Sequence, residues 1–167
     1  MDQRLNIIFA RRSIRRYTGQ PVSEADIASL LEAGMAAPSA SNKKPWHFIV
    51  VQDKAKLQAL ADAYPYGKML PGAALAIAVC GDPATSDWWV QDCTAATENI
   101  LIAVAGLGLG AVWLGCYGRD EREQATRDIL NIPNNIGVLS LLSIGCPDED
   151  KEPRTQYDPA RVHTNQW

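Results

Sequence analysis

Apolar residues recur with two different spacings along this chain. Spacings of three and four residues predict helices over 3–11, 23–37, 88–107 and 120–130, and another after Asp53. Short β-branched or apolar runs predict strands at 46–51, 73–80, 111–115 and 138–144. The run at 73–80 has almost no polar residue, which is typical of a strand buried on both faces. Helices and strands are therefore expected to alternate as far as residue 146.

Local signals mark where several of these elements begin and end. Ser23 is a favourable N-cap, with Asp26 three residues further on in a capping-box position. Asp53 can cap the following helix in the same way. Between them, residues 38–45 begin and end with proline and contain small polar residues, so they are expected to form a loop.

The longest predicted helix, 88–107, is apolar on almost all sides. In a chain of this length, such a helix indicates that a partner subunit covers one of its faces. Gly106, Gly108 and Gly110 follow it in a G-x-G-x-G pattern. A dinucleotide-binding fingerprint must follow a strand and open a helix, whereas these glycines follow a helix and open a strand. We therefore interpret them as a helix end and a turn.

The composition changes from Pro147 onward. Prolines recur at 147, 153 and 159, acidic residues are frequent, and the chain ends in Trp167. This pattern indicates an extended tail rather than a folded unit. A terminal tryptophan is expected to lie against a surface, either of its own chain or of a partner.

Composition and charge narrow the possible classes of protein. The 167 residues carry a net charge of −3 with 47% apolar residues, as expected for one globular domain and not for a general nucleic-acid binder. No apolar run approaches the roughly 20 residues of a membrane span, and the first residues lack a signal-peptide pattern. The four cysteines are dispersed, so we expect them to be reduced in a cytoplasmic protein.

Against this acidic background, residues 11–16 form a basic cluster, Arg-Arg-Ser-Ile-Arg-Arg. If this segment is extended, Arg11, Ser13 and Arg15 share one face, where two guanidinium groups and a hydroxyl would suit a phosphate or the edge of an electron-rich ring. If it is helical, Arg11 pairs with Arg15 and Arg12 with Arg16. The arginines would then be favourable cations at a helix end. The residues alone leave both interpretations open.

No set of side chains typical of direct catalysis is apparent. His47 and His163 are the only histidines and lie far apart in the sequence, which argues against a metal site or a histidine-activated nucleophile. Asp92 and Glu98 have no partner that would make an acid–base pair. We therefore predict no catalytic side chain and no metal, and we expect a cofactor to carry the chemistry of any enzyme built from this chain.

Three stretches, in matching order and spacing along the chain, suggest a family. Residues 11–15, residues 37–46, and Gly108 to Gly115 after a long alanine-rich helix together resemble a small member of the FMN-dependent nitroreductase family. The resemblance implies an α+β fold with a central mixed sheet flanked by helices, in an intertwined homodimer. It also implies a single FMN-binding domain at 1–146, an arm at 147–167 that packs on the partner, and FMN in the crevice between chains.

The resemblance further implies the residues that contact FMN. Arg11 and Ser13 would hold the phosphate, Arg12 would contact the ribityl chain or the ring, and Arg15 would stabilise charge at the pyrimidine edge. The other implied contacts are Pro38, Ser39, Ala40 and Asn42 from the second subunit, Lys68 at the pyrimidine edge, the backbone at Leu114 and Gly115 near flavin N5, and Arg154 at the phosphate.

The implied activity is that of an oxidoreductase. NADH or NADPH would reduce the flavin at N5, and a nitroaromatic, quinone or similar acceptor would then take the hydride at the same site in a ping-pong cycle. The alternative is a flavin-binding sensor or carrier without significant NAD(P)H turnover. Lys44 stands where the family often has glutamine, and the chain lacks an insertion that shapes the substrate pocket of larger members.

Overall fold

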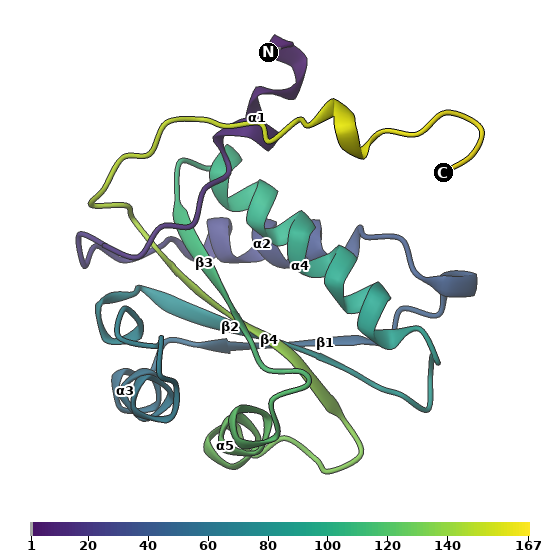
Figure 1. The fold of residues 1–167 in the computed structure, drawn as a ribbon. Coiled ribbons are helices and arrows are strands. Elements are labelled where there is room, and N and C mark those ends of the chain that lie inside the picture. The colour runs from purple at the N-terminus through teal and green to yellow at the C-terminus, as the bar shows by residue number, and fades with distance from the viewer. Residues whose placement is uncertain (1) are drawn as a thin grey trace.

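The computed structural model describes residues 2–167, and Met1, which belongs to the predicted domain, lies outside the described residues. A four-stranded sheet forms the centre of the molecule (Figure 1). In spatial order its strands are β1 (Trp46–Val51), β2 (Leu75–Gly81), β4 (Gly137–Gly145) and β3 (Gly110–Gly115), and every neighbouring pair is antiparallel. The predicted strand at 73–80 thus begins two residues later and ends one residue later.

Two helices cover each face of the sheet (Figure 1). Helices α2 (Glu24–Met35) and α4 (Trp89–Gly106) lie on one face, and α3 (Lys54–Ala63) and α5 (Asp120–Leu130) lie on the other. The predicted caps are confirmed: the Ser23 hydroxyl accepts a hydrogen bond from Asp26 N at 3.0 Å, and the Asp53 carboxylate accepts one from Lys56 N at 2.8 Å. An antiparallel sheet flanked by helices confirms the α+β fold class, although its four strands pair only antiparallel and do not form the mixed sheet that was predicted.

Because β2 and β4 are central and covered on both faces, every one of their residues is buried. Ile77 and Val79 of β2 point into the core beneath α2 and α4, whereas the alternate Ala76 and Ala78 point into the core beneath α3 and α5. The confirmed burial of this run explains why it contains almost no polar residue.

The N-terminal helix is shorter than predicted. A 3-10 turn at Gln3–Leu5 leads into α1 (Asn6–Ala10), and the backbone becomes extended at Arg11, with φ −61° and ψ 115°. The basic cluster at 11–16 is therefore extended, and the helical interpretation of it is wrong. The cluster runs beside β3, where the bridge Ser13–Ala111 is parallel. Within residues 2–167, this isolated bridge is the one parallel pairing next to an otherwise antiparallel sheet.

Helix α4 buries one side against the sheet and α2, through residues such as Ala96, Ile100 and Val104. Its other side leaves Gln91 and Thr94 exposed to solvent in the single chain. None of the helices in residues 2–167 combines the length and the apolar character that crossing a membrane requires.

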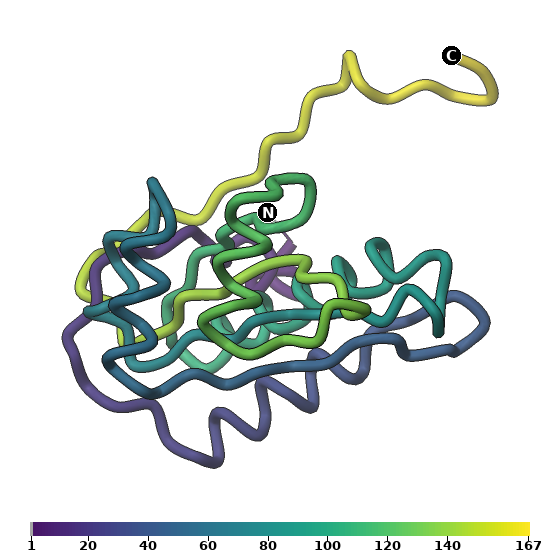
Figure 2. Tube along the Cα trace, turned by 90° about the horizontal axis from the view of Figure 1, so that it is seen from below, coloured from purple at the N-terminus to yellow at the C-terminus, as the bar shows by residue number. Residues whose placement is uncertain are grey.

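After β4 the chain contacts the basic cluster through Asp148 N and Arg16 O and crosses α1 (Figure 1), and then leaves the body of the molecule (Figure 2). Pro147 forms an isolated bridge with Tyr17, and the backbone N–H of Arg154 donates to Phe9 O at 3.1 Å. Every residue from 152 to 167 is exposed, and a short 3-10 turn at Pro159–Arg161 is the one regular element in this stretch.

Candidate functional site

The basic cluster is held against the edge of β3 by one buried residue. Ile14 N donates to Ala111 O at 2.8 Å, and the Ile14 side chain packs over Gly110, where an added Cβ would come within 2.6 Å of it. Glycine at 110 therefore makes room for Ile14. Because side chains of an extended segment alternate, Arg15 next to the buried Ile14 is turned to solvent.

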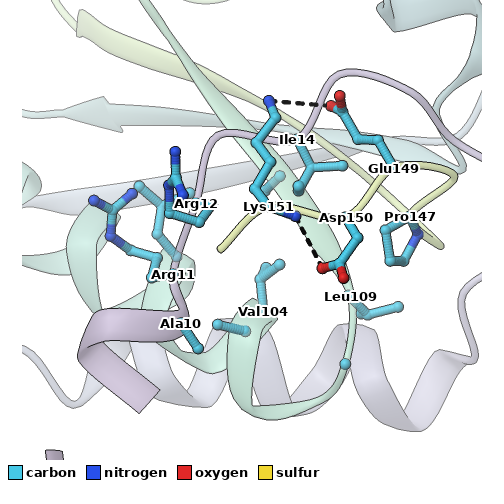
Figure 3. A pocket seen from close by; sticks show the side chains of 14 residues that line it. Ala10, Arg11, Arg12, Ile14, Val104, Leu109, Pro147, Glu149, Asp150 and Lys151 are labelled. Atoms are coloured by element: carbon cyan, nitrogen blue, oxygen red, sulfur yellow. Dashed lines mark hydrogen bonds and ion pairs between the residues drawn. The ribbon is translucent and has the colours of Figure 1, made fainter. Parts of the chain in front are cut away.

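The segment after β4 holds the cluster from its other side (Figure 3). The Glu149 carboxylate accepts hydrogen bonds from the backbone N–H groups of Arg15 at 2.6 Å and Arg16 at 3.3 Å. Lys151 Nζ donates to Ser13 O at 2.5 Å and lies 3.3 Å from the Glu149 carboxylate. The bond from the Arg15 backbone, followed by Lys151, holds the pKa of Glu149 below its usual range. These contacts bind the backbone of the cluster and leave the Arg15 guanidinium outside the network.

One end of the cluster is a groove whose lining holds three cations, Arg11, Arg12 and Lys151, beside two carboxylates, those of Glu149 and Asp150. Arg11 Nε lies 3.0 Å from Glu98 Oε1 of α4, and the Arg12 guanidinium donates to Glu152 O. Arg11 and Arg12, together with Lys151, line a cavity of about 150 Å³ whose floor is formed by apolar residues of α4 and β3 (Figure 3). A neighbouring groove of about 310 Å³ is lined by both Arg11 and Arg154. The structure thus brings together the two arginines that were predicted to bind phosphate.

The other end of the cluster is a pocket of about 230 Å³ over β3. Three of its lining residues, Arg15, Leu114 and Gly115, were predicted to lie near the flavin ring. A Cβ added at Gly115 would meet no atom within 4 Å, so the packing of the chain does not itself require glycine there. The open space above Gly115 leaves room for a flat ligand to approach the backbone.

The remaining lining residues of this pocket were not predicted as site residues: Tyr64, Tyr66, Trp113 and Arg122. The sequence showed 64–71 only as an irregular segment and 120–130 only as a charged surface helix. Two tyrosines in a glycine-containing loop were the available signal, because binding residues are often found on loops and aromatic side chains provide large contact areas. Lys68 is exposed two residues beyond Tyr66 and is not among the lining residues.

The small-residue loop lies at the opposite end of α4 from the basic cluster (Figure 1). Ala40 N donates to Asp92 Oδ1 at 2.9 Å, near the start of α4, and the Ser39 hydroxyl accepts from Lys44 N at 2.9 Å. The cluster instead borders Ala105, near the end of α4. Because an 18-residue helix is about 27 Å long, one chain does not bring this loop to its own cluster.

The remaining candidate groups lie apart from these pockets. His47 is exposed on β1, and His163 stacks on Trp167 with ring centroids 4.3 Å apart. In the described part of the chain, no three histidine, cysteine, aspartate or glutamate side chains come close enough to hold a metal ion. Cys80, Cys93 and Cys116 are buried free thiols.

Comparisons with known proteins identify the family. A profile described as the Nitroreductase family matches residues 8–65 and 64–146. An Archaeoglobus fulgidus protein, provisionally named NADH dehydrogenase/NAD(P)H nitroreductase, is 49% identical over 174 residues, an alignment that covers 100% of both chains.

Two solved structures have a similar fold. An FMN-dependent nitroreductase from Clostridium difficile has a TM-score of 0.93 at 31% identity, covering 98% of this chain and 99% of that one. A protein from Desulfovibrio desulfuricans, provisionally named a nitroreductase and solved in complex with FMN, has a TM-score of 0.84 at 30% identity, covering 100% and 99%. The profile match and the 49% identity over full length show that the chain belongs to the nitroreductase family.

Proposed function

We propose that this protein is an FMN-dependent oxidoreductase that uses NADH or NADPH to reduce a nitroaromatic, quinone or similar acceptor. One observation carries the proposal: a single extended segment, 11–15, joins a groove lined by Arg11 and Arg12 to an open pocket beside Gly115. A phosphate at one end and a flat ring at the other are the two parts of FMN. The names of the relatives, which include FMN-dependent and NAD(P)H-dependent enzymes, support the same cofactor and reductants.

The donor types at each end fit FMN. Arg11 and Arg154 both line the groove and supply guanidinium groups, which suit a phosphate, whereas Ser13 lies in the same extended segment without lining either groove. Arg12 stands beside Arg11 and would contact the ribityl chain. At the ring end, the backbone of Leu114 and Gly115 is accessible and Trp113 provides an aromatic wall. Lys68, by contrast, needs a change of side-chain position or a partner subunit to reach the ring.

We assign to Arg15 the stabilisation of the negative charge that forms on the reduced flavin. Bound FMN supplies the transfer of a hydride from NAD(P)H, through N5, to an acceptor. Reduction puts negative charge on the pyrimidine edge of the ring, and a fixed cation there stabilises that charge. The backbone of Arg15 is fixed by Glu149 at 2.6 Å, which positions the guanidinium without neutralising it. No acid or base from the chain is assigned to the reaction, and the flat pocket would admit donor and acceptor in turn, as a ping-pong cycle requires.

The complete site would need a second copy of the chain. Pro38, Ser39, Ala40 and Asn42 lie at the far end of α4 from the cluster, so pairing α4 antiparallel with its copy would bring the loop of each chain to the cluster of the other (Figure 1). Ile7 and Ile8 of α1, and Leu5 in the 3-10 turn before it, are also exposed to between 41% and 47%. Exposed apolar residues clustered on one short helix favour an interface. We therefore propose an intertwined homodimer in which the arm 147–167 packs on the partner.

Absorbance of the purified protein tests this function. The protein should be yellow, or become yellow and stay so when FMN is added and the excess is removed. Anaerobic NADH or NADPH should bleach the flavin bands, and a quinone should restore them. A protein that retains no FMN would overturn the proposal. Retention of FMN without reduction by either nucleotide would favour the carrier or sensor alternative instead.

A further inference from the structure

Arg122, in the first turn of α5, lies on the wall of the ring-end pocket without an acidic partner. Its guanidinium carbon is 6.0 Å from the ring centroid of Tyr64 and 5.9 Å from that of Tyr66. Its one hydrogen bond in the described residues runs from Nη1 to Gly115 O at a long 3.4 Å. Since a guanidinium has five N–H donors, most of the donor capacity of Arg122 is unused.

Neighbouring contacts fix this wall in place. The Tyr64 hydroxyl is buried 2.7 Å from Cys116 Sγ and 2.7 Å from Thr126 Oγ1, so it joins its loop to the residue that follows β3 and to α5. Burial raises the pKa of Tyr64, so the hydroxyl stays protonated and can donate. Tyr66 follows on the same turn with its side chain 72% exposed. The fixed Tyr64 and the exposed Tyr66 each present an aromatic ring to the Arg122 guanidinium for a cation–π contact.

The charge in this pocket is of one sign. Its lining contains two cations, Arg15 and Arg122, and no carboxylate. Among residues 2–167, none of the ion pairs involves either of these arginines. In a protein with a net charge of −3, two unpaired guanidinium groups beside three aromatic side chains form a local site suited to an anion on a flat ring.

We propose that Arg122 is a specificity-determining residue that selects flat aromatic acceptors bearing a carboxylate or sulfonate. With the flavin ring in the space above Gly115, the acceptor ring stacks on the flavin and borders Tyr66, and its anionic group accepts hydrogen bonds from the free N–H groups of Arg122. Arg15 is then left to the flavin edge, so the two cations have separate roles. This assignment rests on the proposed function, because it names the class of acceptor at the same site.

A matched pair of acceptors tests this role: 4-nitrobenzoate and nitrobenzene, assayed with the FMN-loaded protein. In the wild type, kcat/KM should be higher for 4-nitrobenzoate. In Arg122→Gln, the ratio of the two kcat/KM values should fall about tenfold or more, chiefly through KM, because a charge-assisted hydrogen bond is lost. Arg122→Lys should restore part of the ratio, because it keeps the charge but not the planar fork.

Arg119→Gln is the control variant. This substitution removes the same charge one residue before α5, and Arg119 does not line the pocket. It should leave the ratio unchanged. An equal fall of the ratio in Arg119→Gln would show a general field effect and overturn the assignment.

Two further outcomes would also overturn it. Equal kcat/KM for both acceptors in the wild type would show that the site does not recognise the carboxylate of the acceptor. A loss in Arg122→Gln confined to NADPH, with NADH and both acceptors unaffected, would assign Arg122 to the extra phosphate of the reductant. The proposed function fails in a different way, because FMN would then not be retained or not be reduced by either nucleotide.

Discussion

Two segments that meet at the proposed phosphate end of the site are held very differently. Residues 11–17 are fixed by backbone and side-chain contacts from β3, Glu149 and Lys151, and Ile14 is buried at 8% exposure. Residues 154–167 are exposed throughout. In the described chain, one hydrogen bond from Arg154 N to Phe9 O joins this second segment to the rest of the molecule.

The difference shows which half of the site one chain builds by itself. Ordering the backbone costs roughly 1–2 kcal/mol per residue, and this cost is offset only where the segment buries surface or makes hydrogen bonds. Residues 11–17 meet that condition within their own chain, whereas 154–167 do not, and Trp167 is 100% exposed. We therefore expect the first segment to be ordered in any state of the protein and the second to depend on a partner subunit.

Deleting residues 154–167 should have the largest effect, because it removes most of the arm together with Arg154. We expect the dimer to dissociate and FMN affinity to fall by roughly a hundredfold or more, since the linked contacts of arm and phosphate are lost together. Size-exclusion chromatography with light scattering, and fluorescence titration with FMN, would measure the two effects. The full-length Arg154→Ala variant is the control, because it removes the cation and keeps the arm. A truncated protein that stays dimeric and yellow would disprove this role of the arm.

Arg11→Ala tests the segment that is already fixed. We expect the dissociation constant for FMN to rise about 10- to 100-fold, the equivalent of about 1.5–3 kcal/mol for a hydrogen bond to a charged group. The fold should be little affected, since the Arg11–Glu98 ion pair is partly exposed, at 30% and 43%, and such pairs contribute about 0–1 kcal/mol.

Glu98→Gln provides the matched control for Arg11. It removes the carboxylate that pairs with Arg11 and leaves the cation, so FMN affinity should stay the same or rise. Equal FMN affinity in the wild type and in Arg11→Ala would exclude Arg11 from the phosphate site.

Glu149→Gln should give the smallest effect, on the stability of residues 11–17. A neutral amide accepts the Arg15 and Arg16 N–H groups less strongly, so we expect a loss of about 1 kcal/mol in the free energy of unfolding at pH 7. Because the folded pKa of Glu149 is lowered, its contribution is complete above about pH 4.3 and is lost as pH falls through the lower folded value. Urea unfolding at pH 7, 5 and 3.5 should therefore show that the free energies of unfolding of the wild type and of Glu149→Gln converge in acid. A difference that does not change with pH would contradict the role of the carboxylate.

The sequence alone determined the local elements and the family. Strand positions followed from apolar runs, and helix starts followed from the caps Ser23 and Asp53, because both signals arise from neighbouring residues. The three motifs in register indicated the nitroreductase family, which the comparisons confirm. The roles of the individual FMN contacts remain predictions, although the structure places Arg11 with Arg154 and Arg15 with Gly115.

Only the tertiary structure decided the state of the basic cluster and the composition of the pocket. The sequence could not choose between a helix and an extended segment at 11–16, because the deciding contacts come from Ala111 and Glu149. Likewise, Tyr66 and Arg122 meet beside Gly115 only because the sheet order and the packing of α3 against α5 bring three distant segments together. Local periodicity depends on near neighbours, whereas a site wall depends on which residues meet after the chain has crossed the sheet.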